Sequence, residues 1–211
     1  KLNIFKPSTP LKGTPVIFFV HGGRWTDGTK DKYDFVGKTF SDQGFYVVIP
    51  DYSKYPNVKF PVFVDDTARA LAWTSENIES YGANPENIFV MGHSSGAHIG
   101  ALIASNPAYL DQFGHTRDVI AGFIGLAGPY AFTPEEPDLK DIFGPPSNYP
   151  NMQSTTFIDG TQPPMLLLNG QDDDIVETSN TTAMVNVIQE KGGRVSSKVY
   201  KGFDHVDMVS A

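Results

Sequence analysis

The chain has 211 residues, a net charge of −8, a hydrophobic content of 40% and no cysteine. This length suits one globular domain over residues 1–211, and an acidic chain without a basic cluster is not expected to bind nucleic acid or an anionic membrane surface. Because no run of about 18 apolar residues occurs, we expect no transmembrane helix. The lack of cysteine excludes disulfides and thiolate chemistry but does not decide the compartment, for which the cytoplasm is slightly favoured. The oligomeric state is left open.

Short apolar runs alternate with amphipathic stretches along the chain. Apolar runs of four to eight residues are too short for helices and are typical of buried strands. The strands expected on this basis cover residues 2–5, 16–20, 45–49, 88–91, 119–126, 165–168 and 195–200. Helical periodicity predicts helices over residues 33–43, 62–81, 97–104 and 178–191. The alternation predicts an α/β fold built on a doubly wound, mostly parallel sheet with helices on both faces.

The motif Gly92-His93-Ser94-Ser95-Gly96 lies between the apolar run at 88–91 and a helical stretch of small residues. A strand, then Gly-x-Ser-x-Gly, then a helix is the arrangement of a nucleophile elbow. Side chains at the two glycine positions would collide with the neighbouring strand and helix, and the strained turn presents the serine hydroxyl to solvent. The sequence therefore predicts Ser94 as a nucleophile.

A serine hydroxyl needs a base within hydrogen-bond reach, and the base needs an orienting group. Of the five histidines, His205 alone comes from a separate strand end late in the chain. His93 and His98 are too close to the serine in sequence to fold back onto it as a base. His21 belongs to a glycine-rich loop, and His115 lies in an unpatterned segment. We therefore predict His205 as the general base.

Three consecutive aspartates follow the strand at 165–168, between the serine and the histidine in the chain. Asp173 fits the orienting acid best because Gly-x-x-Asp-x-x-Val matches Gly170 to Val176. Asp172 is the alternative, and the remaining acidic side chains of this turn are expected to be solvated. The resulting order Ser, Asp, His is the one expected for α/β-hydrolases.

The third requirement is a pair of donors for an oxyanion, each of which is typically worth about a hundred- to a thousand-fold in rate. Gly22 and Gly23 follow the strand at 16–20, and without a Cβ their amides can approach a ligand closely. We assign one donor to the Gly23 N–H, helped by Gly22, and the other to the Ser95 N–H. A plain turn is the alternative for the two glycines.

Arg24 and Trp25 come next and are candidates for lining a substrate pocket. Trp25 is expected either to pack beneath the glycine loop or simply to fill the core. Residues 130–164 show no strong period and are rich in Pro, Asp and Tyr, so we expect a short lid-like excursion with a helical turn or two. Histidine spacing typical of metal sites and a phosphate-binding glycine loop are both absent from the sequence, so neither a metal nor another cofactor is expected.

These motifs resemble those of α/β-hydrolase esterases with a His-Gly-Gly-x-Trp oxyanion motif. The match rests on His21 to Trp25 together with Gly92 to His98 and extends from about Leu2 to His205. The resemblance is to the branch that contains bacterial carboxylesterases, kynurenine formamidase (arylformamidase) and feruloyl or acetyl-xylan esterase-like proteins. It implies a serine hydrolase that cleaves a carboxylic ester, or an activated amide, through an acyl-enzyme. Because the excursion over 130–164 is short for a lid, we expect a fairly open pocket and small acyl groups.

The resemblance leaves two other functions open and shows two departures. Kynurenine formamidase-type amide hydrolysis uses the same fold, and a non-catalytic hydrolase-like protein would bind a small ligand in the same pocket. Arg24 is larger and more charged than the residue that the family often has there, which affects the expected acid or leaving-group preference. The chain stops six residues after His205, before the family's usual final helix, so we expect either a shortened domain or a minimal member.

Overall fold

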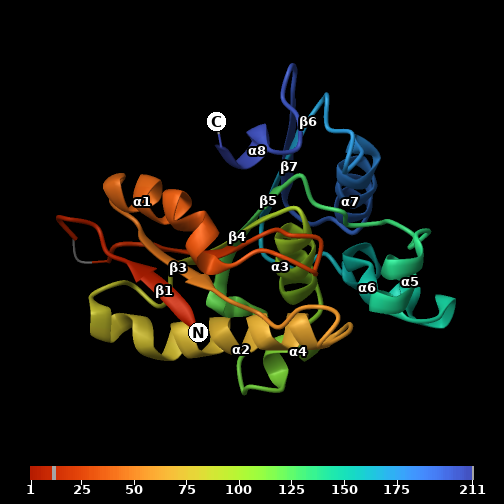
Figure 1. The fold of residues 1–211 in the computed structure, drawn as a ribbon. Helices are drawn as coiled ribbons and strands as arrows, with labels where there is room; N and C mark the ends of the chain where they lie inside the picture. Colours follow the sequence, from red (N-terminus) through yellow and green to blue (C-terminus); the bar gives the residue numbers. More distant parts are fainter. Residues whose placement is uncertain (11–12, 211) are drawn as a thin grey trace.

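The computed structural model describes residues 1–10 and 13–210 (Figure 1). Short 3-10 turns join several of the regular elements. In chain order, the strands and α-helices are β1 (Leu2–Phe5), β2 (Val16–Val20), α1 (Asp34–Asp42), β3 (Tyr46–Pro50), α2 (Val62–Asn77), β4 (Ile88–His93), α3 (Ser95–Ser105), α4 (Ala108–Asp111), β5 (Ile120–Leu126), α5 (Pro137–Phe143), α6 (Tyr149–Met152), β6 (Met165–Gly170), α7 (Thr178–Glu190), β7 (Val195–Tyr200) and α8 (Asp207–Ser210).

The strands in the described part of the chain form one sheet in the order β1-β3-β2-β4-β5-β6-β7. Only β1 runs antiparallel to its neighbour β3, and the other pairs are parallel. In the sheet, β3 lies on one side of β2 and β4 on the other, so the chain winds in both directions from β2, as in doubly wound sheets. The predicted α/β-hydrolase fold with a mostly parallel sheet is confirmed.

The alternation of side chains along β2 explains why both faces of the sheet are covered. Val16, Phe18 and Val20 belong to a core cluster with residues of α2, α3 and α7, whereas Ile17 and Phe19 belong to a second cluster with residues of α1 and α8. Figure 1 shows α1 and α8 on one side of the sheet and α2 and α3 on the other. A strand buried on both faces reads as a continuous apolar run, which is the pattern seen in the sequence.

Two element boundaries differ from the expectation. The helix expected over 62–81 remains an α-helix only to Asn77, and a 3-10 turn over Ile78–Tyr81 completes it before Gly82, whose φ of 102° stops the helix. The strand before the serine runs to His93 rather than to Met91, because Gly92 and His93 still pair with β5. The sheet therefore supports the chain up to the residue before Ser94.

The excursion over 130–164 contains α5, α6 and two 3-10 turns, in agreement with the expected helical turns. None of the helices among the described residues combines the length and the apolar character needed to cross a lipid bilayer.

Candidate active site

Ser94 occupies a sharp turn between β4 and α3. Its backbone has φ 56° and ψ −125°, a left-handed region that is costly for a residue with a Cβ. A Cβ on Gly92 would lie 2.4 Å from the carbonyl oxygen of Gly96, and a Cβ on Gly96 would lie 2.1 Å from that of Val20. Both contacts are far shorter than atoms tolerate, so the turn can form only with glycine at these two positions. The half-buried serine side chain stands at the carboxyl end of β4.

His205 and Asp173 meet at the same edge of the sheet, from the loops after β7 and β6. The Nδ1 atom of His205 lies 2.9 Å from Asp173 Oδ2, and both side chains are buried. The carboxylate is held from its other side, because Oδ1 accepts backbone N–H groups of Ile175 at 3.0 Å and Val176 at 2.8 Å. Since a carboxylate oxygen accepts, Nδ1 of His205 donates to it, and the lone pair of a neutral ring is then on Nε2.

The structure separates Asp173 from its two neighbours. Asp172 and Asp174 are exposed, whereas the side chain of Asp173 is fully buried. The Asn169 amide also lies at 3.5 Å from Asp173 Oδ2. The sequence analysis did not single out Asn169, and only its position at the end of β6 indicated that it faces the same edge of the sheet. Of the two aspartates left open by the sequence, the geometry favours Asp173 as the partner of His205.

The glycine loop after β2 forms a tight turn with several left-handed residues. Gly23 has φ 131°, and Arg24 and Trp25 have φ 53° and 61°. A Cβ on Gly23 would lie 2.2 Å from the carbonyl oxygen of Asp27, so this position also requires glycine. The Gly23 carbonyl accepts N–H groups of Thr26 at 3.0 Å and Asp27 at 2.8 Å, which closes the turn.

Ser95 supplies the second predicted oxyanion donor. It is the first residue of α3, and the first N–H groups of a helix have no acceptor within the helix. Its backbone N–H is therefore free of an intrahelical partner at the positive end of the helix dipole. Both predicted donor segments, the Gly22–Gly23 loop and the start of α3, follow parallel neighbouring strands β2 and β4.

His21, at the start of the glycine loop, is a buried supporting residue. Its Nδ1 donates to the Gly22 carbonyl oxygen at 2.8 Å, and its ring stacks on Tyr52 with centroids 4.4 Å apart. The Tyr52 hydroxyl in turn donates to the His21 carbonyl oxygen at 2.9 Å. Burial lowers the pKa of His21 to about 4, so the ring is neutral at pH 7. These contacts fix the backbone just before the predicted oxyanion donors.

Trp25 joins the glycine loop to the excursion. Its ring stacks on Phe132 with centroids 5.6 Å apart and meets Phe143 edge-on at 4.9 Å. The indole Nε1 donates to His98 Nδ1 at 3.3 Å, and His98 Nε2 donates to the Met152 carbonyl oxygen at 2.6 Å. Burial lowers the pKa of His98 to about 4, which keeps Nδ1 available as an acceptor. Of the two expected roles, these contacts support the filling of the core, where the Trp25 ring is 4% exposed.

Arg24 is engaged by two carboxylates of the excursion. Its guanidinium contacts Glu136 and lies 3.1 Å from Asp138, at the start of α5. The hydrogen bond to Glu136 raises the pKa of Arg24. Its side chain is 46% exposed, so these contacts are solvent-screened and contribute little to stability. Their consequence is that the positive charge of Arg24 is already compensated by two negative charges.

A cavity of about 150 Å³ opens at Ser94. The predicted pocket residues Arg24 and Trp25 line it, together with apolar side chains of the excursion and of the loop after β6. Its lining consists of Arg24, Trp25, Ser94, Ser95, Pro129, Phe132, Leu139, Ile175, Val176 and Asn180. Apolar walls with a few polar groups at one end are typical of a site for a small ligand.

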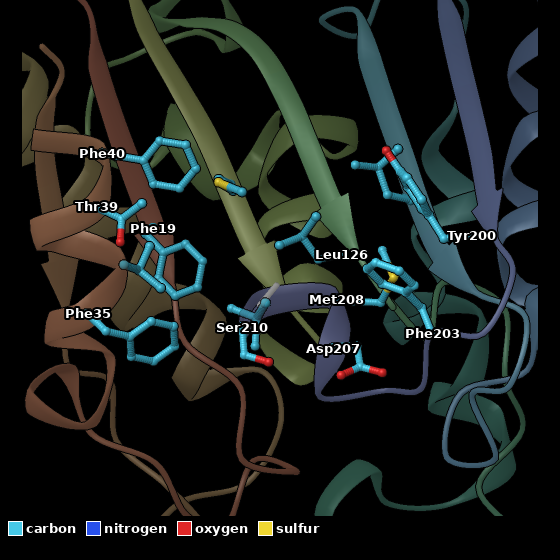
Figure 2. Close-up of a pocket in the computed structure, with 14 residues that line it drawn as sticks. Phe19, Phe35, Thr39, Phe40, Leu126, Tyr200, Phe203, Asp207, Met208 and Ser210 are labelled. Atoms are coloured by element: carbon cyan, nitrogen blue, oxygen red, sulfur yellow. The ribbon is translucent and has the colours of Figure 1, made fainter. Parts of the chain in front are cut away.

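A second, larger hollow of about 630 Å³ lies between α1 and α8 (Figure 2). Phe19, Phe40, Leu126 and Tyr200 point into it from α1 and from the sheet. None of the predicted catalytic side chains lines it. The position of the catalytic side chains, rather than the size of a hollow, therefore identifies the 150 Å³ cavity as the candidate site. Across residues 1–10 and 13–210, no group of three or more His, Asp or Glu side chains is placed to hold a metal ion.

Comparison with known proteins finds one matching family model and relatives that are named as esterases. The BD-FAE family model matches residues 2–132. Esterase LipQ of Mycobacterium tuberculosis is 26% identical over 89% of this chain and 49% of its own length. The isoprenylcysteine alpha-carbonyl methylesterase ICME of Arabidopsis thaliana is 24% identical over 99% of this chain and 54% of its own. The chain thus spans about half the length of the curated relatives it matches.

Among solved structures, esterase 2 of Thermogutta terrifontis has a TM-score of 0.83 over 97% of this chain and 79% of its own, at 22% identity. A likeness at this identity supports the shared α/β-hydrolase fold.

Proposed function

This chain belongs to the BD-FAE family, and from that premise and the geometry of its site we propose that it is a serine hydrolase that cleaves carboxylic esters. In this proposal Ser94 is the nucleophile, His205 the general base and Asp173 the orienting acid. The N–H groups of Gly23 and Ser95 bind the oxyanion, supported by Gly22. Residues 1–211 act as a single catalytic domain, and the excursion over 130–164 serves as a short lid.

The observation that carries the proposal is the buried hydrogen bond of 2.9 Å between His205 and Asp173 at the sheet edge where Ser94 occupies its strained turn. Three loops from separate strands supply these residues, and packing alone does not require a buried aspartate beside a buried histidine there. Strained backbone and buried ionisable pairs of this kind concentrate at functional sites. The related proteins named as esterases support the same reaction class.

The proposed reaction proceeds in two halves. Ser94 Oγ attacks the ester carbonyl while His205 Nε2 accepts its proton, and Asp173 stabilises the resulting imidazolium through Nδ1. The tetrahedral oxyanion is bound by the two backbone N–H groups. His205 then protonates the departing alcohol oxygen and leaves an acyl-enzyme on Ser94. Water, deprotonated by His205, attacks the acyl group and releases the acid.

The cavity sets the size of the acyl group. At about 150 Å³ the cavity is well below the roughly 300–1,000 Å³ that is typical of pockets for drug-sized ligands. A pocket of this size favours short acyl groups, such as acetyl to butyryl. Arg24 is the only cationic side chain among the described residues that line the pocket, and Glu136 and Asp138 already compensate it, so an acidic acyl group finds no uncompensated positive charge on these residues. We therefore propose short, uncharged acyl groups as the preferred substrates.

The test is a series of p-nitrophenyl esters from acetate to palmitate, hydrolysed by the wild type, Ser94→Ala and Ser105→Ala. Ser105 is a matched control because it is a buried serine of α3 whose Oγ donates within the helix, to the carbonyl oxygens of Ala101 and Leu102. We expect activity on acetate and butyrate that Ser94→Ala abolishes and Ser105→Ala retains. Activity that survives in Ser94→Ala would contradict the assignment of the nucleophile.

Two further substrates separate the alternatives. Turnover of N-formylkynurenine far above that of simple esters would favour amide hydrolysis on the same machinery. Methyl esters belong in the panel because a relative is named as a methylesterase. An absence of turnover on every compound, together with measurable binding of small esters to the wild type, would favour a non-catalytic binding protein.

A further inference from the structure

Two side chains outside the proposed triad connect its base to the oxyanion loop. His93, the residue before Ser94, has Nε2 at 2.9 Å from the backbone carbonyl oxygen of His205. Its ring lies beside that of His205, with centroids 4.9 Å apart. On its other side, His93 Nδ1 is 3.5 Å from the hydroxyl of Tyr33. The sequence analysis excluded His93 as a base and gave no role to Tyr33.

The direction of each hydrogen bond follows from the chemistry of the groups. A carbonyl oxygen only accepts, so His93 Nε2 carries the proton and donates to His205. Nδ1 of the neutral ring is then an acceptor, and Tyr33 O–H donates to it. The backbone of Gly22 packs against the same hydroxyl, since a Cβ on Gly22 would lie 3.1 Å from Tyr33 Oη. One directed hydrogen-bond chain therefore runs from Tyr33 through His93 to His205, and the glycine loop lies against its Tyr33 end.

This hydrogen-bond chain requires a neutral His93, and the surroundings of the ring keep it uncharged. The ring is buried, and burial lowers the pKa of His93 to about 4, with the neighbouring His205 acting in the same direction. The contact with the His205 carbonyl and the charge of Asp173 oppose this shift without reversing it. The Nδ1 lone pair is therefore available to Tyr33 at pH 7.

The two ends of this hydrogen-bond chain lie at the His205 loop and at the glycine loop, the two parts of the site that must be placed relative to one another. Asp173 fixes the imidazole of His205, but the backbone of His205 lies in a short loop between β7 and α8. The bond from His93 is the contact that ties this backbone to the end of β4. At the other end, a Cβ on Gly22 would lie 3.1 Å from both His93 Nδ1 and Tyr33 Oη, so the oxyanion loop packs directly on the same two side chains.

We propose that His93 and Tyr33 are positioning residues, which hold the His205 loop and the Gly22–Gly23 loop in register so that the base and the oxyanion donors face the same carbonyl. This proposal rests on the proposed esterase function for its kinetic consequences. Neither residue touches the reacting atoms. Their effect is geometric, and displacements of about 1 Å in such sites cost about 100-fold in rate.

The test compares Tyr33→Phe, His93→Leu and His93→Gln with the wild type. Leucine removes both bonds of His93, whereas the glutamine amide can still donate to the His205 carbonyl. We expect kcat on p-nitrophenyl acetate to fall about 10- to 100-fold in His93→Leu, with KM within twofold, and to recover at least fivefold in His93→Gln. Tyr33→Phe, which loses one neutral hydrogen bond, is expected to lower kcat about 3- to 10-fold.

Tyr46→Phe is the matched control for the tyrosine. Its hydroxyl donates to the Tyr81 carbonyl oxygen at 2.7 Å, at the opposite end of β3 from the site. This control is expected to lose thermal stability and keep its kcat. A His93→Leu protein with a lower Tm but a kcat within twofold of the wild type would overturn the proposal, because it would show a purely structural role. Equal losses in His93→Gln and His93→Leu would overturn it as well.

A second measurement does not depend on esterase activity. The His205 Nδ1 proton, bonded to Asp173, is followed by NMR through its rate of exchange with solvent. Faster exchange in Tyr33→Phe than in Tyr46→Phe supports the positioning role, and equal exchange overturns it. If His93→Leu does not fold, this NMR comparison of Tyr33→Phe with Tyr46→Phe still tests the positioning role. If the wild type hydrolyses no ester, the proposed function fails, while the exchange rates still decide whether Tyr33 and His93 hold His205.

Discussion

Replacement of Asp173 by asparagine tests the proposed triad most directly, because the structure dictates how the new amide will lie. Oδ1 of Asp173 accepts two backbone N–H groups, from Ile175 and Val176. The amide oxygen of asparagine must take this position, since an NH₂ group there would face two donors. The amide nitrogen then takes the place of Oδ2 and donates to Nδ1 of His205. This locks the proton of the neutral ring on Nε2, where it cannot accept the proton of Ser94.

The expected loss of activity is the loss caused by holding the histidine ring in the wrong tautomer. In serine proteases with the same triad, the equivalent change lowers kcat by about 10⁴-fold, which corresponds to about 5 kcal/mol of transition-state stabilisation. We expect a loss of about 10³- to 10⁴-fold in kcat/KM on p-nitrophenyl acetate for Asp173→Asn. Asp172→Asn is the matched control, because it makes the same chemical change on the neighbouring exposed aspartate. This control is expected to stay within threefold of the wild type.

The assay measures initial rates at pH 7 to 8 for the three proteins, after circular dichroism has shown that all are folded. Retention of more than a tenth of the activity in Asp173→Asn would refute the tautomer argument. A larger loss in Asp172→Asn than in Asp173→Asn would show that the acid had been assigned to the wrong residue.

Three further predictions concern stability and specificity. Burial lowers the pKa of three histidines, His21, His93 and His98, to about 4. In the unfolded state a histidine has a pKa of about 6.5, so between about pH 6.5 and 4 the unfolded protein binds more protons than the folded protein. The free energy of unfolding should therefore fall by up to about 4 kcal/mol per pH unit as the pH drops from 6.5 toward 4. Urea titrations that give the same free energy of unfolding at pH 7 and at pH 5 would contradict this. Gly96→Ala should abolish esterase activity and lower Tm strongly, since its Cβ would lie 2.1 Å from the Val20 carbonyl oxygen. Gly192→Ala, at φ 73° in open space, should cost only about 1 kcal/mol in the same thermal melt. Phe132→Ala should enlarge the cavity and raise relative activity on longer p-nitrophenyl esters by about fourfold per accommodated methylene; an unchanged chain-length profile would show that Phe132 does not limit the pocket.

The sequence determined the fold class and the elbow because both depend on local physical constraints. A strand buried on both faces must be apolar throughout, so 16–20 and 88–91 could be recognised without knowledge of their neighbours. The two glycines around Ser94 are likewise required by contacts within a few ångströms of the turn itself. The parallel strands then place every segment that follows a strand at one edge, which made His205 a reasonable prediction before its contacts were known.

Between Asp173 and its alternative Asp172, only the tertiary structure shows which side chain lies beside His205. Successive residues in a loop point in different directions, and only the path of the loop after β6 turns Asp173 toward His205 and leaves its neighbours in solvent. The compensation of Arg24 by Glu136 and Asp138 is also tertiary, because Arg24 lies more than 100 positions before these two residues and meets them only when the excursion packs on Trp25.

His93 shows, within a single motif, the same division between what the sequence reveals and what the tertiary structure decides. Its place beside Ser94 was evident from the sequence, and that adjacency was the reason not to predict it as a base. Its bond to the His205 carbonyl could not be predicted, because it joins residues 112 positions apart across two strands that are not neighbours in the sheet. Sequence patterns report which side chains a local turn or strand requires, whereas hydrogen bonds between distant loops depend on the angles at which those loops leave the sheet.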